Sequence, residues 1–348
     1  MHTARLIPRW FLVILTMIFV ILPASAREKT DEVILKNGDH LTCWIQTLAR
    51  GMLTVKTDPM GTIEIKWQDV QKITSRYLFR VEDNYGNLYV GSLWPGIDKE
   101  HMDIAGMLPV SNLSYLSIVE IMEVGGSRWQ RFSGAADLGY SFTKASDRTQ
   151  FNFTGDIEYR TERYSGQLNY SSTLGTSKGE TDADRKLTSL VGIRQFSGKW
   201  IAYSQVRFEH NLELELDRRY SFLGGPGYKI AQSNRALITA IGAASFSRES
   251  YYGESSMKNA EGFFGVDVQF FKLYSPKFDI VNQRLFIPNF TTRGRRRLEF
   301  NSKLRFEVLR DFFVTMTLYD SFDSKPPSET AVKNDYGFTT GLSWTFGR

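Results

Sequence analysis

The C-terminal part of the chain alternates hydrophobic and polar residues over long segments. From Phe151 to Arg160 nearly every second side chain is aromatic or aliphatic, and the stretch from Arg297 to Val308 has the same pattern. A period of two places successive side chains on opposite faces of a β-strand. Segments of about ten such residues match the length that a tilted strand needs to cross a bilayer. The pattern therefore predicts membrane-spanning strands.

Segments of this kind recur to the end of the chain, and the connections between them alternate between short and long. Bacterial outer-membrane barrels have an even number of strands, short periplasmic turns and long external loops. The predicted fold is all-β, with an antiparallel transmembrane β-barrel of about twelve strands over residues 129–348 and ten strands as the alternative. The predicted strands lie near 129–142, 149–161, 164–174, 186–195, 200–208, 217–230, 235–247, 260–274, 278–289, 297–309, 312–322 and 334–346.

The polar faces of two of these strands carry charges of both signs. We expect them to face the lumen, where they either pair across it and close it or line a narrow channel and set its selectivity. The sequence leaves both alternatives open. The predicted lumen-facing residues are Asp156, Glu158, Arg160, Arg297, Glu299, Lys303, Arg305 and Glu307.

Residues 27–125 have a different sequence pattern, which predicts short strands separated by turns such as Asn37-Gly38. They predict a small SH3-like or Sm-like β domain. Asp69–Ile73 resembles one turn that leads into a last short strand. The stretch from Phe79 echoes the one from Val33, which suggests two repeated units. A linker is expected at 126–128. This domain either binds a periplasmic partner through residues 27–125 or caps the barrel.

The first 26 residues have the features of a signal peptide. Arg5 and Arg9 precede a short apolar run, and Ala24 and Ala26 have the spacing of a signal-peptidase site. The signal peptide at 1–26 and the predicted barrel together indicate the outer membrane of a Gram-negative envelope, with the domain at 27–125 in the periplasm.

Charge is divided unevenly along the exported chain. Residues 27–125 carry 10 Lys+Arg and 14 Asp+Glu (10 − 14 = −4), whereas residues 126–348 carry 31 and 24 (31 − 24 = +7). A basic exported region favours anionic glycolipid as a partner, and no nucleic-acid motif is present. Arg293, Arg295 and Arg296 are predicted at the external rim, where arginine suits lipopolysaccharide phosphates. A solvated basic loop is the alternative.

Residues suited to catalysis or metal binding are scarce. Cys43 is the only cysteine, and the histidines are His2, His40, His101 and His210. None has a serine two positions away, as barrel lipases need, and no Asp-x-His occurs. We therefore predict a non-enzymatic protein with no metal site and no cofactor.

The chain ends on a motif that resembles the signal read by the barrel-assembly machinery, a further expected partner: Thr339-x-Gly341-x-x-Trp344-x-Phe346. This segment, the stretches Leu214–Tyr228 and Tyr319–Ser328, and the opening Val33–Thr42 resemble the domain-of-unknown-function 481 family, some of whose members are described as salt-induced outer-membrane proteins. The resemblance implies an outer-membrane barrel and supplies no catalytic residue. The expected role is structural or limits permeability, with osmotic stress implied by the family alone. A small-solute porin or transporter and a barrel-anchored periplasmic binding module are the alternatives.

Overall fold

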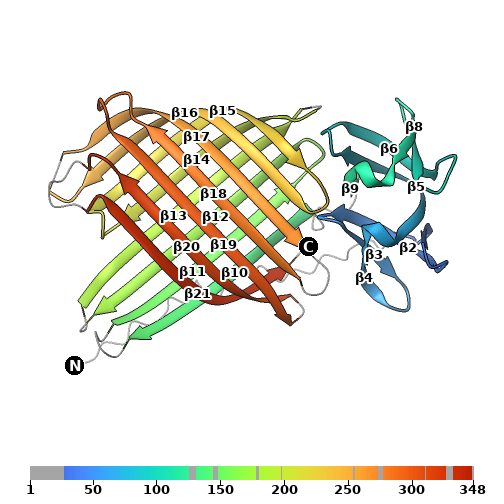
Figure 1. Ribbon diagram of the computed structural model, residues 1–348, viewed down its shortest axis with the longest axis horizontal. Coiled ribbons are helices and arrows are strands. Elements are labelled where there is room, and N and C mark those ends of the chain that lie inside the picture. Colours follow the sequence, from blue (N-terminus) through green and yellow to red (C-terminus); the bar gives the residue numbers. More distant parts are fainter. Residues whose placement is uncertain are drawn as a thin grey trace, which may run out of the picture.

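The computed structural model describes residues 27–124, 131–143, 148–177, 180–196, 198–253, 255–272, 277–309, 311–326 and 332–346. The predicted signal peptide and linker lie outside these residues. The described chain forms an N-terminal β region and a closed barrel, placed end to end (Figure 1). The predicted fold class, an all-β protein with a twelve-stranded barrel behind a small β region, is confirmed.

The barrel strands pair antiparallel in chain order, and the last strand returns to the first. Several strands are longer than predicted. The loop expected at 175–185 is reduced, because polar residues beyond the apolar belt continue the hydrogen-bonded ladder up to Ser177 and from Glu180. The strands are β10 (Phe132–Thr143), β11 (Arg148–Arg160), β12 (Tyr164–Ser177), β13 (Glu180–Gln195), β14 (Trp200–Asn211), β15 (Leu216–Gln232), β16 (Ala236–Tyr251), β17 (Met257–Lys272), β18 (Phe278–Pro288), β19 (Arg296–Leu309), β20 (Phe312–Asp323) and β21 (Asn334–Phe346).

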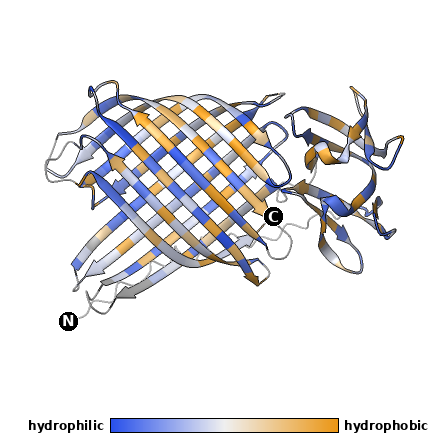
Figure 2. Ribbon diagram, in the orientation of Figure 1, coloured by the Kyte–Doolittle hydropathy of each residue, from blue (hydrophilic) through white to orange (hydrophobic). Residues whose placement is uncertain are grey.

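The barrel is apolar outside and polar inside. On β21, Leu342, Trp344 and Phe346 point outward, whereas Ser343 and Thr345 are buried on the inner side. The alternation of hydrophobic and hydrophilic positions is visible along the strands of the wall (Figure 2). In the described part of the chain, no helix is both long and apolar enough to cross a membrane.

The N-terminal region contains the strands β1 (Asp31–Leu35), β2 (His40–Ala49), β3 (Met52–Thr57), β4 (Gly61–Lys66), β5 (Val70–Asp83), β6 (Leu88–Pro95), β7 (His101–Ala105), β8 (Val110–Ser114) and β9 (Ile118–Glu123), with single 3-10 turns η1 (Trp67–Asp69) and η2 (Tyr115–Ser117). A 3-10 turn precedes β5 and another precedes β9. The first half of β5 pairs with β1, and its second half pairs with β6 and β9.

Strand β5 is shared by both halves of this region. The turn predicted to lead into a strand at Asp69–Ile73 is present as η1, but the strand is longer than predicted, since β5 continues to Asp83. The reason is a common core, in which Ile73 from the first half and Val81 from the second are both fully buried. The Trp67 indole N–H donates to the carbonyl of Tyr115 at 2.7 Å and joins the two 3-10 turns.

The N-terminal region lies against one end of the barrel, here called the near end; the opposite end is the far end (Figure 1). Turns of the barrel wall at the near end contact it directly. The Gly198 N–H donates to the Gly86 carbonyl at 2.9 Å, and the Asn234 side chain donates to the Ile118 carbonyl at 2.8 Å.

Candidate functional site

The lumen and its two mouths concentrate the charged side chains of the barrel. The inner face of β19 lies opposite the exposed Leu298 and Phe306, and that of β11 lies opposite the exposed Phe151 and Ile157. By strand alternation, the structure places on these inner faces Arg297, Glu299, Lys303, Arg305, Glu307, Asp156, Glu158 and Arg160.

Two of the β19 cations are paired with carboxylates of nearby strands. Arg297 contacts Glu261 at 2.8 Å, and Arg305 contacts Asp279 at 2.7 Å. Both arginines are almost completely buried. Because a buried charge is costly without a partner, these pairs fix the guanidinium groups against the wall. They occupy lumen space and are not available as mobile charges.

Other contacts cross the lumen from wall to wall. Arg207 of β14 contacts Glu299 of β19 at 2.9 Å, although β15, β16, β17 and β18 separate these strands in the ring. Toward the far end, the Asn211 amide donates to Asp335 of β21 at 3.2 Å. Lys303, in the middle of β19, pairs with Asp137 of β10, three strands away in the ring. Opposite walls are therefore joined by side chains.

A network of arginines and acids fills the lumen near the far end. Glu249, which has no exposed surface, contacts Arg219 at 3.0 Å and Arg295 at 2.9 Å. Arg295 also contacts Asp323 at 2.6 Å and donates to the Tyr251 hydroxyl at 3.1 Å. Positive and negative side chains alternate in space, so each charge is neutralised by its neighbours.

This network corrects one predicted site residue. Arg295 is 2% exposed and its guanidinium is taken up by protein partners, so it does not present itself to an external lipid phosphate. The cause is strand alternation after the turn at Gly294, whose φ is +80°. Arg295 and Arg297 point inward, whereas Arg293 and Arg296 are exposed. Only these two keep the exposure that the lipopolysaccharide prediction requires.

At the near end, the N-terminal region contributes buried charges to the mouth of the barrel. Glu82 accepts hydrogen bonds from Lys229 at 2.6 Å and from Gln232 at 2.7 Å, both on β15. Burial opposes ionisation of Glu82, but Lys229 and Arg80 outweigh it and hold the pKa of this carboxyl below its usual value. The carboxylate is thus charged at neutral pH and tied to the barrel wall.

Arg80 and Glu120 continue this contact. Arg80 pairs with Glu120 and donates to the Glu162 carbonyl of the barrel at 3.1 Å. Glu120 in turn contacts Arg160 of β11 at 2.6 Å, so a predicted lumen residue binds the N-terminal region. The exposed rim adds a contact between Lys277 and Glu64 at 3.1 Å.

The charged residues of this interface were missed by sequence reasoning. Arg80 and Glu82 alternate with Phe79 and Val81 on β5, which is the pattern of a strand with one solvated face. In the structure all four are buried, because the barrel covers the charged face. The one available signal is that a strand with core residues on one face carries charges of both signs on the other.

The predicted barrel-assembly residues lie on β21. Trp344 and Phe346 point outward, and Thr339 and Gly341 lie on the inner face. A Cβ atom on Gly341 would lie 2.5 Å from the carbonyl oxygen of Leu138 on β10. Glycine is therefore required where the last strand meets the first.

Within the described ranges, no three or more His, Cys, Asp and Glu side chains gather as metal ligands.

A closed ring with an apolar exterior and a charged interior is a membrane-type β-barrel, here with side chains across its lumen and its own N-terminal region on one mouth. The family model "Protein of unknown function, DUF481" matches residues 136–346, and the chain belongs to this family. This confirms the family resemblance described above.

Similarity to other proteins is distant. A comparison with curated proteins gives no significant match. Among solved structures, a "Bacterial polysaccharide outer membrane secretin" is 7% identical, with a TM-score of 0.33 over 62% of this chain and 97% of that chain. The "KdgM porin in complex with disordered oligogalacturonate" is 10% identical, with a TM-score of 0.33 over 61% and 99%. The "Outer-membrane expressed OmpT of Vibrio cholerae" is 10% identical, with a TM-score of 0.30 over 78% and 95%. Scores this low carry no argument about function.

Proposed function

We propose that this protein is a non-enzymatic outer-membrane β-barrel that limits permeability, with its lumen held closed by ion pairs and its near mouth covered by its N-terminal region. The observation that supports this most directly is the contact between Arg207 and Glu299, at 2.9 Å across the lumen. The bridging side chains occupy part of the lumen at this level, so they restrict the passage of solute while the pair holds. A role in osmotic stress rests on the family resemblance alone.

The proposed orientation follows from the chain. β10 begins and β21 ends at the near end, and outer-membrane barrels keep both chain ends in the periplasm. The N-terminal region would then lie in the periplasm and the far end outside the cell. The motif at Thr339, Gly341, Trp344 and Phe346 would be read by the barrel-assembly machinery during insertion.

Single-channel conductance in a planar bilayer tests the closed lumen, using full-length refolded protein whose unboiled gel band runs faster than the boiled one. The wild type should show no discrete steps. The double variant Arg207→Ala/Glu299→Ala removes the pair without leaving an unpaired charge, and we expect it to conduct. The control is Arg218→Ala/Asp217→Ala, which removes an exposed pair with a contact of 2.9 Å outside the lumen.

Large open steps in the wild type, unchanged by Arg207→Ala/Glu299→Ala, would refute the closed lumen and favour the alternative of a small-solute porin. In that case the charges on the inner faces of β11 and β19 become selectivity residues. Ion selectivity would then shift in Lys303→Gln, because this side chain reaches from β19 to Asp137 on β10.

A second candidate function is a periplasmic binding module anchored by the barrel. It is favoured by apolar side chains at the outer tips of the N-terminal region, where Met107 is 100% and Leu108 84% exposed. Exposed apolar patches mark interaction sites. A photo-crosslinking residue at position 107 in the full-length protein should give one discrete adduct in cells, whereas the same probe at exposed Asp58 should not. No adduct at 107 would count against this function.

A further inference from the structure

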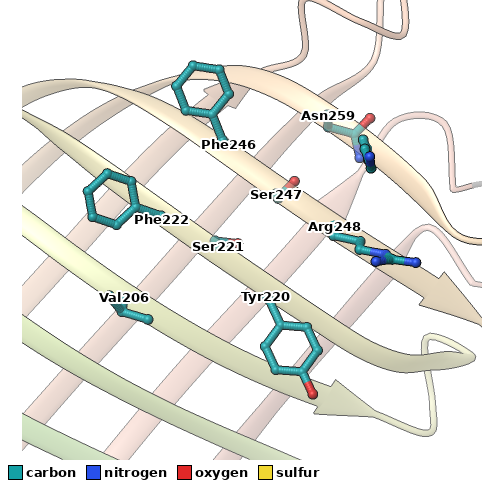
Figure 3. A pocket seen from close by; sticks show the side chains of 9 residues that line it. Val206, Tyr220, Ser221, Phe222, Phe246, Ser247, Arg248 and Asn259 are labelled. Carbon is teal, nitrogen blue, oxygen red and sulfur yellow. The ribbon is translucent and has the colours of Figure 1, made fainter.

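An open groove lies on the outer surface of the barrel, toward the far end, where β14, β15, β16 and β17 run side by side. Its volume is about 400 Å³. Figure 3 shows Phe222 and Phe246 standing out from neighbouring strands, with Arg248 further along toward the end of β16. Because this is the face that the barrel turns to lipid, the groove faces the membrane and not the lumen.

The residues around the groove form two rows that follow the strand register. The row closer to the far end is Tyr220, Arg248 and Lys258, which are direct cross-strand partners. The next row on the same face contains Val206, Phe222 and Phe246. Rows two residues apart are separated by about 7 Å along the strands. The row that contains the two cations therefore lies next to the apolar row, on its far-end side.

Arg248 and Lys258 are like charges placed opposite each other, an arrangement that lowers the stability of a sheet. Both are exposed, and neither makes an ion pair within the part of the chain that the structure describes. The Arg248 Nε donates to the Ser256 hydroxyl at 2.9 Å, which leaves its terminal nitrogens free to donate outward. An anion bound between the two cations would remove their repulsion.

We propose that this groove binds the phosphorylated glycolipid of the outer leaflet, with a lipid A phosphate on Arg248 and Lys258 and an acyl chain along Val206, Phe222 and Phe246. A phosphate suits the guanidinium and ammonium donors. The charged row lies closer to the far end and the apolar row closer to the middle of the barrel. This order matches a lipid whose phosphorylated head group lies at the outer surface of the membrane and whose acyl chains extend into it. The membrane orientation rests on the proposed function, but binding to the purified protein does not.

This site is distinct from the two exposed arginines of the predicted rim, Arg293 in the β18–β19 connection and Arg296 at the first position of β19. Arg293 is carried by a loop and Arg296 lies at the very end of a strand, whereas Arg248 and Lys258 lie on paired strands next to an apolar groove. The groove supplies the acyl contact that a rim arginine lacks. Only this site is expected to distinguish a lipid from a free phosphate.

The test uses full-length protein refolded without lipopolysaccharide in detergent and titrated with diphosphoryl lipid A, with retained lipid counted by native mass spectrometry. We expect Arg248→Gln/Lys258→Gln to weaken retention by about tenfold or more. The matched control Lys199→Gln/Arg235→Gln removes two cations at the near end and should retain lipid A like the wild type. Phe246→Ala should weaken retention of lipid A but not of inorganic phosphate.

Equal retention by the wild type and Arg248→Gln/Lys258→Gln would overturn the proposal. If that variant does not fold, the wild type alone decides: it should retain diphosphoryl lipid A at least about tenfold better than the dephosphorylated lipid or phosphatidylcholine. Equal binding of all three lipids would mean acyl contact without phosphate recognition and would also overturn it. In lipid-free protein, Lys258→Gln should raise Tm, because it removes the facing like charge.

Discussion

Replacing Glu82 with glutamine should weaken the docking of the N-terminal region on the barrel without unfolding either part. The carboxylate is 1% exposed and lies 2.6 Å from the Lys229 ammonium. Breaking a buried ion pair by removing one partner costs about 3–5 kcal/mol. The Lys229 side chain is 13% exposed and therefore partly hydrated, so we expect the loss of this pair to weaken docking by about 2–3 kcal/mol. That corresponds to a shift of roughly 30- to 150-fold in the docking equilibrium.

Hydrogen exchange of the Gly198 amide measures this shift, because its N–H donates to the Gly86 carbonyl only while the two parts are docked. Protection of that amide should fall by the same factor in Glu82→Gln. Amides of β1 and β5 inside the N-terminal core should keep their protection. The matched control is Glu64→Gln, whose contact with Lys277 is exposed and should change protection less than about fivefold.

Two results would refute this reasoning. Unchanged exchange at Gly198 in Glu82→Gln would mean that the buried pair does not hold the docked state. Equal loss of protection in the β1–β5 ladder would mean that the variant unfolds the N-terminal region instead of releasing it.

The remaining predictions concern pH, the cysteine and the barrel seam. Docking lowers the pKa of Glu82 below its usual 4.5, so the ionised carboxylate favours docking above that pH, and this contribution is lost as the pH falls through the lowered pKa. Protection of the Gly198 amide, corrected for intrinsic exchange, should therefore stay level at neutral pH and fall in acid. A rise of protection in acid would contradict this. Burial removes all exposure of Cys43 and raises the pKa of its thiol to about 12, so a maleimide should label it only after unfolding in urea; rapid labelling of native protein would show that the core opens. Gly341→Val forces a side chain against the Leu138 carbonyl and should lower barrel stability by about 1–3 kcal/mol, seen as loss of the fast-running unboiled gel band, whereas Gly166→Val, with open space around it, should keep the band.

The barrel could be predicted from sequence because its strands are governed by one local rule. A period of two over about ten residues, with short and long connections in turn, specifies strand count and which face meets lipid. The rule also placed Lys303 and Arg305 on the inner face. It could not say which partner each would meet, because Asp137 and Arg207 come close to β19 only when the ring closes.

The docking of the N-terminal region could not be predicted for a related reason. Arg80 and Glu82 have the spacing of a solvated strand face, and only the barrel beyond them makes that face an interface. Arg295 shows the opposite error. A run of arginines in a predicted loop predicts one exposed patch, whereas the return to strand geometry after Gly294 turns alternate members inward.

The joint between β10 and β21 also bears on how the barrel is made. Within the described residues, β10 pairs with β21 only from Gly134 to Leu138, whereas it pairs with β11 along its whole length from Phe132 to Thr143. Every other joint forms between strands that are neighbours in the chain, but this one joins the two ends. It is therefore both the last contact available during biogenesis and the shortest, so the ring should open there first when the folded barrel is pulled apart.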